Sequence, residues 1–173
     1  MTDVRIRVSR ELSRDERQAL AGGEADPFGL GSMQLVARDK DWHLFAEIDG
    51  RPVAHVGLLA HQVLAGDLPV AVAGVGGVLT APDFRNQGLA RRLLREASPL
   101  MTRTLGAEFG FLFCFPRLVP FYERLGWRQL EPPVLIEQPG GGEVEASPFG
   151  AMTLRLGARD WPPGAVRTRS LLW

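Results

Sequence analysis

The feature that most constrains the fold is a long, almost uncharged stretch over residues 52–82. It carries one formal charge, Asp67, in a chain of 173 residues of which 23% are charged. Its length would suit a membrane span, but the five glycines and two histidines within it do not. Near-continuous Val, Leu and Ala is typical of strands covered on both faces. We therefore predict two long buried strands joined by a turn at Gly66-Asp67.

Local patterns in the front of the chain predict a helix and a further strand. Ser13 and Glu16 have the spacing of a capping box, which predicts a short helix ended by the glycines at 22 and 23. Residues 42–48, followed by Asp49-Gly50, predict a strand and a hairpin turn. Residues 24–41 show no period, so we expect loops or a short helix there.

Apolar residues at helical spacing predict an amphipathic helix that begins at about Asn86. Gly106 is its expected stop, and Pro99 inside the pattern should kink or end it, because proline lacks an N–H to donate. Arginines lie largely between the apolar positions, where we expect a solvated face.

The back of the chain predicts a buried strand over residues 109–115, a short helix over 119–125 and two strands within 134–156. The chain is long enough for one domain and too short for two. We predict a single α/β domain spanning residues 1–173, with a mixed, mostly antiparallel central sheet and helices on both faces.

Charge is spread unevenly along a chain whose formal net charge is zero. Residues 85–128 carry eight basic and three acidic side chains, whereas residues 1–84 carry eight basic and twelve acidic ones. The basic middle suits a polyanion, and the acidic front suits a cation. The chain as a whole lacks the positive excess of a nucleic-acid or anionic-membrane binder, so we predict neither partner.

The most informative segment, residues 75–90, runs from a strand into a helix. Gly88 removes side-chain bulk where the helix begins, so several backbone N–H groups can point at one anion. This geometry suits a pyrophosphate, although a tight strand-to-helix connection alone would also explain the glycine. The segment lacks the Lys-Ser/Thr pair of a nucleoside-triphosphate loop and the first glycine of a dinucleotide fingerprint.

Two motifs resemble the GNAT acyl-CoA N-acetyltransferases. Arg85-Asn86-Gln87-Gly88-Leu89-Ala90 is similar to the Arg/Gln-x-x-Gly-x-Gly/Ala signature of that family. Further along, Phe121-Tyr122-Glu123-Arg124-Leu125-Gly126-Trp127 resembles its second block, a short helix with an aromatic pair. The resemblance covers essentially the whole chain. It implies the GNAT fold, with a sheet splayed between two strands, and acetyl-CoA as co-substrate for N-acetylation of a small-molecule amine.

The resemblance also implies which residues contact the cofactor. Backbone groups of Val78, Leu79 and Thr80 would meet the thioester carbonyl and the pantetheine arm. The pyrophosphate would be held by Arg85, Asn86, Gln87, Gly88, Leu89 and Ala90. Gly76-Gly77 is a natural place for a bulge, which frees backbone N–H groups. Such a donor stabilises a tetrahedral oxyanion by roughly 3 kcal/mol in acyl-transfer sites; the side chain of Val78 fits a plain core strand equally well.

Tyr122, the only tyrosine, is by this resemblance the general acid that protonates the departing thiolate. An aromatic packing residue beside Phe121 is the alternative. The amine must lose a proton, and His55, with a reference pKa near neutrality, is the best side-chain candidate for the base. A buried structural histidine is at least as consistent with the sequence.

Looser likenesses concern the acceptor. Several segments resemble aminoglycoside 2'-N-acetyltransferases, and residues 160–164 resemble nodulation-type N-acyltransferases, which together imply an aminoglycoside or another amino-sugar. The aminoglycoside enzymes carry a glutamate at the place of Gly76, which this chain lacks. We expect Asp26, Gly76, Gly77 and Trp173 to bind the acceptor.

Further expectations follow from what the sequence does not contain. Three histidines show no ligand pattern with carboxylates or thiolates, so no metal is predicted. One cysteine and no signal-peptide pattern fit a cytoplasmic protein. The apolar tail and Trp161 could form the contact of a homodimer. The alternative to an enzyme is a non-catalytic acyl-CoA-binding or sensing domain that has lost its base.

Overall fold

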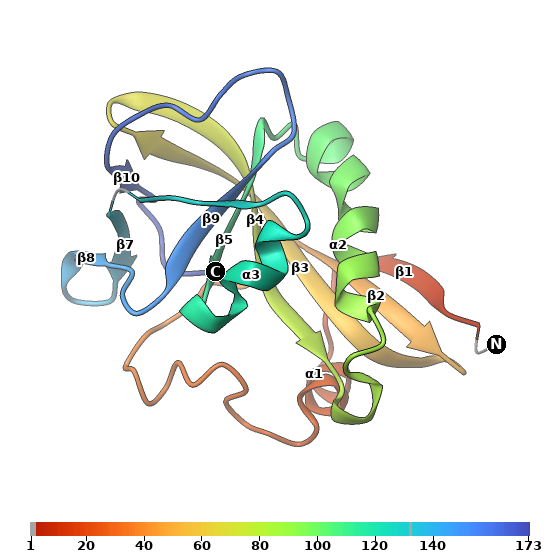
Figure 1. Cartoon of the computed structure of the whole chain (residues 1–173). Helices are drawn as coiled ribbons and strands as arrows, with labels where there is room; N and C mark the ends of the chain where they lie inside the picture. The colour runs from red at the N-terminus through yellow and green to blue at the C-terminus, as the bar shows by residue number, and fades with distance from the viewer. Residues whose placement is uncertain (1–2, 132) are drawn as a thin grey trace.

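A computed structural model describes residues 3–131 and 133–173. One curled sheet of ten strands forms the body of the molecule, in the order β6-β9-β5-β4-β3-β10-β7-β8, with β2 on β3 and β1 on β2 (Figure 1). Pairings β4–β5 and β10–β7 are parallel and the others antiparallel, so the prediction of a mixed, mostly antiparallel sheet is confirmed. The strands are β1 (Arg5–Ser9), β2 (Trp42–Ile48), β3 (Arg51–Ala65), β4 (Leu68–Thr80), β5 (Phe109–Cys114), β6 (Arg128–Gln129), β7 (Val134–Gln138), β8 (Gly142–Glu145), β9 (Gly150–Arg155) and β10 (Val166–Arg167).

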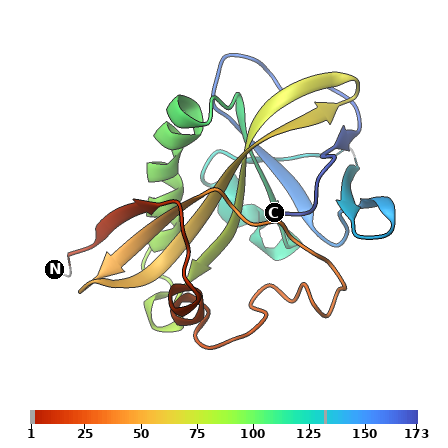
Figure 2. The ribbon, with the colours of Figure 1, turned by 180° about the vertical axis from the view of Figure 1, so that it is seen from behind.

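Helices lie on both faces of this sheet, as expected. α2 (Leu89–Pro99) and α3 (Val119–Glu123) stand in front of the strands in Figure 1, and α1 (Arg14–Ala21) lies on the opposite face, toward the viewer in Figure 2. α2 packs on the sheet with Leu89, Leu93, Leu94 and Ala97, all buried.

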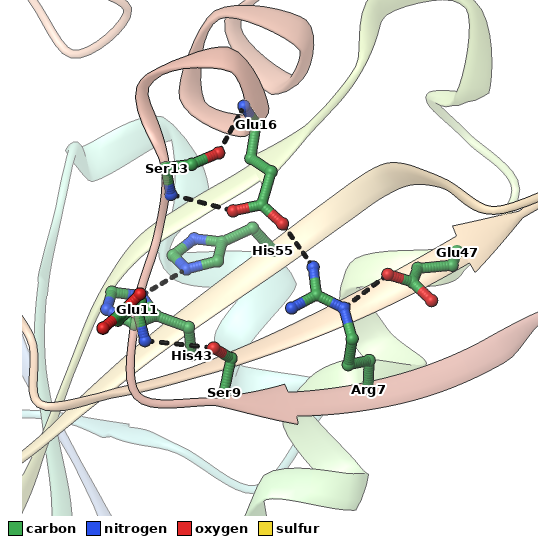
Figure 3. A network of polar contacts seen from close by, with 8 residues as sticks. All are labelled: Arg7, Ser9, Glu11, Ser13, Glu16, His43, Glu47 and His55. Carbon is green, nitrogen blue, oxygen red and sulfur yellow. Dashed lines mark hydrogen bonds and ion pairs between the residues drawn. The ribbon is translucent and has the colours of Figure 1, made fainter.

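The front of the chain forms the elements that the sequence predicts. Ser13 caps α1 with both hydrogen bonds of a capping box, and Gly22 ends the helix in a left-handed conformation. Asp49 and Gly50 both have positive φ, as a tight hairpin turn between β2 and β3 requires. Arg7 on β1 forms ion pairs with Glu16 on α1 and Glu47 on β2, which tie the helix to the sheet (Figure 3).

The central hairpin of β3 and β4 is the frame of the fold. Its turn falls at Gly66-Asp67, as predicted, and its strands are almost entirely buried on the side of the core. The pairing passes from Gly57↔Gly76 to His55↔Leu79 with a shift of register. Two residues of β4, Gly77 and Val78, therefore oppose one residue of β3, which is a β-bulge. The bulge expected at the glycine pair is thus present.

The sheet opens between β4 and β5. These parallel strands pair from Val72↔Phe109 to Val75↔Leu112 and then diverge. Residues of β4 beyond Val75 have no partner on the β5 side, and the bulge lies directly beyond this point. The sheet is therefore splayed between two strands, as the resemblance implies.

Two expected helices differ in their bounds. The long helix begins at Leu89, not Asn86, because Asn86 and Gly88 both have positive φ, and Gly88 is the N-cap. Pro99 ends the α-helical part, but the chain continues as a wider π-helical turn over Leu100–Thr104 before Gly106. The short helix α3 ends at Glu123, two residues before the expected end.

The tail contains three strands where two were predicted. Residues 146–149, which include Pro148, separate β8 from β9, and β9 crosses the molecule to pair with β5. Trp161 packs edge-on against Phe109, with ring centroids 5.0 Å apart, and stays partly exposed. No helix of the described ranges is long and apolar enough to cross a membrane.

Candidate active site

A cavity of about 220 Å³ lies at the divergence of β4 and β5. The residues beyond the last β4–β5 pair form one wall, and α3 and the loop of residues 22–41 form others. That loop returns to β2 alongside the last residues of the chain, where Arg38 N donates to Leu172 O at 2.7 Å (Figure 2). Predicted site residues in the lining are His55, Gly76, Gly77, Val78, Tyr122 and Trp173.

The two glycines of the bulge are required by close contacts. At Gly76 a Cβ atom would lie 2.8 Å from the Lys40 Cε and 2.6 Å from the terminal carboxyl carbon of Trp173. Gly77 has a φ of +60°, and a Cβ there would lie 3.3 Å from the His55 ring. Larger residues would fill the space that Lys40, His55 and Trp173 occupy.

Tyr122 lines this cavity from α3 and is 5% exposed. Its ring packs edge-on against Phe121 and Trp127. Burial raises the pKa of Tyr122, and the neighbouring Cys114 raises it further. The phenol is therefore protonated at neutral pH and can donate a proton.

His55 is engaged at both ring nitrogens. Its Nδ1 lies 2.6 Å from the carbonyl oxygen of Gly77, and its Nε2 lies 2.9 Å from Nδ1 of His43 (Figure 3). A carbonyl oxygen only accepts, so His55 Nδ1 carries a proton. In the neutral ring Nε2 then accepts, and His43 Nδ1 donates to it. The lone pair left in this pair belongs to Nε2 of His43.

Both rings of this histidine pair are neutral at pH 7. Burial lowers the pKa of His55 to about 4, although its hydrogen bond to Gly77 acts in the opposite direction. Burial also lowers the pKa of His43, and Arg17 adds to this effect. The alternative of a buried, hydrogen-bonded histidine therefore describes the setting of His55 well.

Lys40, the only lysine, reaches the cavity across two glycines. A Cβ at Gly57 would lie 2.7 Å from the Lys40 Cγ, just as one at Gly76 would meet the Cε. The ammonium donates to the carbonyl oxygen of Arg38 at 3.1 Å. Burial lowers the pKa of Lys40 to about 8, with Asp39 acting in the opposite direction.

Trp173 forms part of the floor of the cavity. Its indole Nε1 donates to the carbonyl oxygen of Phe111 at 3.2 Å, and its ring lies directly over Gly74, where a Cβ would be 2.7 Å from Nε1. The side chain is 5% exposed.

A second hollow of about 290 Å³ lies where β4 leads into α2. The two hollows share elements, since Val78 and Tyr122 line the first while Thr80 and Phe121 line the second. The predicted cofactor residues in the second lining are Thr80, Asn86, Gly88, Leu89 and Ala90.

Some predicted residues lie outside both linings. Asp26 accepts hydrogen bonds from the backbone N–H groups of residues 30 and 31, which orders its own loop. Leu79 pairs with His55. Arg85 donates to Thr80 O, and Gln87 donates to Asp83 O, each at 3.3 Å.

Several lining residues were missed by the sequence reasoning. His43 could have been found from the hairpin register, because it lies diagonally across from His55 on the paired strands. Lys40 was marked only by its being the sole lysine. Arg17 lies in the helix predicted from the capping box, and Arg38 lies in residues 24–41, which show no period. Arg91 lines the second hollow.

The model of the acetyltransferase (GNAT) domain family matches residues 32–130, more than half of the chain. The chain therefore belongs to the GNAT acetyltransferase family. No match is found among the curated proteins. No group of three or more His, Cys, Asp or Glu side chains within the described ranges could hold a metal ion.

Solved structures show the same fold at low sequence identity. The GNAT family N-acetyltransferase YhbS from Escherichia coli, in complex with CoA, is 20% identical with a TM-score of 0.65, over 98% of this chain and 91% of that one. A GNAT acetyltransferase from Brucella melitensis in complex with acetyl-CoA is 22% identical, with a TM-score of 0.55 and 94% of each chain covered. Escherichia coli ElaA is 16% identical, with a TM-score of 0.56, over 90% of this chain and 100% of that one.

Proposed function

We propose that this protein transfers an acetyl group from acetyl-CoA to a primary amine of a small molecule, by direct attack of the amine on the thioester. The observation that carries the proposal is the shared position of Tyr122 and the bulge at Gly77 and Val78 on one cavity at the splay of β4 and β5. A proton donor and a distorted strand with unpaired residues are what acyl transfer from a thiol needs.

The second hollow fits the phosphate end of the cofactor. It lies at the N-terminus of α2, where backbone N–H groups without helical partners favour an anion, and Arg91 adds a positive charge. From Thr80 the pantetheine arm follows β4 to Val78, which places the thioester beside Tyr122. The relatives from Escherichia coli and Brucella melitensis that hold CoA and acetyl-CoA support this assignment.

The reaction then needs one bond formed and one broken. The amine nitrogen bonds to the acetyl carbon, and a backbone N–H of the bulge stabilises the oxyanion of the tetrahedral intermediate. Collapse of the intermediate breaks the carbon–sulfur bond, and the thiolate takes a proton from Tyr122. The products are the amide and CoA, and the tyrosine regains its proton from solvent.

A proton must also leave the attacking nitrogen. We assign its acceptance to the histidine pair, with Nε2 of His43 as the accepting lone pair and His55 as the residue that fixes the His43 tautomer. His55 is in this proposal a positioning residue, because both of its nitrogens are occupied. Ordered water can carry the proton from the amine to the pair.

Calorimetric titration with acetyl-CoA, followed by a thiol-release assay over a panel of amines, tests the proposal. Binding followed by release with at least one amine is the expected result. Binding without release on any amine favours the non-catalytic acyl-CoA-binding domain, and absence of binding contradicts both functions. An aminoglycoside belongs in the panel because an amino-sugar acceptor stays a prediction, as do the cytoplasmic location and the homodimer.

A further inference from the structure

The cavity of about 220 Å³ at the divergence of β4 and β5 would receive the amine under the proposed function and is named the acceptor cavity. It is positively charged, although the front of the chain, which supplies much of its lining, is acidic overall. Its lining holds three cationic side chains, those of Arg17, Arg38 and Lys40. The lining holds two carboxylates, the Asp39 side chain and the terminal carboxyl group of Trp173, so the three cations remain in excess. The other titratable side chains of the lining are His43, His55, Cys114 and Tyr122. All four are neutral at pH 7, because burial lowers the pKa of both histidines and raises the pKa of the Cys114 thiol and the Tyr122 phenol.

These cations are not neutralised by ion pairs. Within residues 3–131 and 133–173, no ion pair includes Lys40, Arg17 or Arg38. Arg38 instead donates to the Ser170 hydroxyl at 3.3 Å, and Lys40 donates to a backbone carbonyl. The terminal carboxyl carbon of Trp173 and the Lys40 Cε would lie 2.6 Å and 2.8 Å from the same Cβ at Gly76. This carboxyl group and Asp39 do not offset three cations, so the cavity favours an anion that enters with a ligand.

Lys40 is held in place rather than free to swing outward. Its stem lies against Gly57 and Gly76, at positions where any side chain would collide with it. The chain thus keeps two glycines on adjacent strands at the point where a long cationic side chain crosses them. This packing of the Lys40 stem directs its ammonium group to one point of the cavity next to the bulge.

The rest of the lining is apolar and largely aromatic. It includes Phe28, Leu30, Phe113, Phe115, Phe149 and Trp173. The volume of about 220 Å³ is below the ~300 Å³ typical of the smallest ligand pockets, so the acceptor is small. An apolar wall with a fixed cation suits a ligand that has an apolar body and one anionic group.

We propose that the acceptor is a primary amine that also carries a carboxylate and an apolar body, as a hydrophobic amino acid does, and that Lys40 binds the carboxylate. This inference rests on the proposed function, because it names the substrate class of the same site. The phosphates of CoA do not account for the cationic cluster, since the hollow at the N-terminus of α2 is a separate one. The acidic acceptor site expected from the charge distribution is not what lines the cavity.

The test compares amines that differ only in the carboxylate. L-phenylalanine is paired with 2-phenylethylamine and L-leucine with 3-methylbutylamine, with spermidine and an aminoglycoside as cationic acceptors. We expect kcat/KM for each amino acid to exceed that of its partner at least tenfold. In Lys40→Met, which keeps an unbranched apolar stem over the glycines, we expect most of that preference to disappear through a rise in KM.

Two further variants guard against a folding artefact. Asp39→Asn removes the single carboxylate side chain of the lining and should increase the preference for the amino acids. Arg51→Gln removes one positive charge at an exposed position outside the cavity and should leave the preference unchanged. Thermal melts of all three variants show whether each is folded.

Binding of the products separates this inference from the proposed function. N-acetyl-L-phenylalanine and N-acetyl-2-phenylethylamine are titrated against the CoA-saturated protein. If no amine is acetylated but the carboxylate ligand binds more tightly in a manner that needs Lys40, the proposed reaction fails and the anionic site stands. Equal or better use of the amines without a carboxylate, with no effect of Lys40→Met or Asp39→Asn, overturns the inference.

Discussion

The two hollows on either side of the splay are built in different ways. The one at the N-terminus of α2 is formed mainly by a contiguous segment, residues 80–91, and offers backbone N–H groups. The acceptor cavity is formed by side chains from α1, β2, β3, β4, β5, α3, the loop of residues 22–41 and the last residues of the chain. A backbone site tolerates different side chains as long as its conformation is kept. A side-chain site depends on each residue and on the packing of distant segments, so under the proposed function it is where the specificity of this chain would reside.

The largest expected effect is a fall in kcat that leaves cofactor binding almost unchanged. Tyr122→Phe removes the proton donor but keeps the packing against Phe121 and Trp127, so kcat should fall by roughly 100-fold or more, as for loss of a general acid. The dissociation constant for acetyl-CoA should change little. Single-turnover thiol release and calorimetry measure the two quantities, and an unchanged kcat would remove Tyr122 from the mechanism.

The buried His55 of the acceptor cavity should also make the stability of the protein sensitive to acid. The pKa of His55 is about 4 in the folded chain against 6.5 for the ordinary group, so the unfolded chain binds more protons between these values. The free energy of unfolding therefore falls as the pH drops from 6.5 to 4, by roughly 3 kcal/mol for this residue. His43, whose pKa is also lowered, adds to the same trend.

Urea denaturation at a series of pH values measures this effect. In His55→Gln, which keeps an amide able to donate to Gly77 O, the loss of stability between pH 6.5 and 4 should be much shallower than in the parent protein. An equally steep loss in both proteins would show that His55 does not titrate as the structure implies.

A substitution at Gly88 should weaken the binding of acetyl-CoA without affecting the binding of the acceptor amine. Gly88 has a φ of +76°, and a Cβ there would meet nothing closer than 3.5 Å, from Arg91. Gly88→Ala therefore costs about 1 kcal/mol through backbone conformation and not through collision. We expect a roughly fivefold weaker binding of acetyl-CoA, with an unchanged KM for the amine. A rise in the amine KM alone would contradict the division into two sites.

The smallest expected effect concerns an exposed charge. Arg91→Gln removes a cation from the lining of the second hollow, and an exposed pair with a phosphate is worth roughly 0.5–1 kcal/mol at most. Binding of acetyl-CoA should weaken about threefold at low ionic strength, and the difference from the parent protein should shrink as salt is added. A difference that does not depend on salt would mean that Arg91 acts by packing.

The difference between the two hollows also explains what could be predicted. The capping box at Ser13, the turn at Asp49-Gly50 and the bulge at the Gly76-Gly77 pair depend on local chemistry, and all three are confirmed. The start of α2 was placed too early, because apolar periodicity does not show that Asn86 and Gly88 have positive φ.

The acceptor cavity required distances that no local pattern contains. Lys40 and Gly57 are separated by a whole strand and a turn, and only the fold brings the lysine stem onto that glycine. Asp26 looked suitable for a cationic amine, yet its oxygens are taken by backbone N–H groups of its own loop. The net charge of the cavity lining therefore could not be predicted from the net charge of residues 1–84.

The short parallel contact between β4 and β5 makes the stability of the whole molecule depend on ligand supply. Strands β5, β9 and β6 join the rest of the sheet only through the register Val72↔Phe109 to Val75↔Leu112. A molecule lodged in the slot beyond Val75 touches both halves and acts as a clamp. By mass action, a ligand present at 100 times its dissociation constant adds about 2.7 kcal/mol to the free energy of unfolding. Under the proposed function, the protein would thus be most resistant to unfolding and proteolysis when its substrates are abundant.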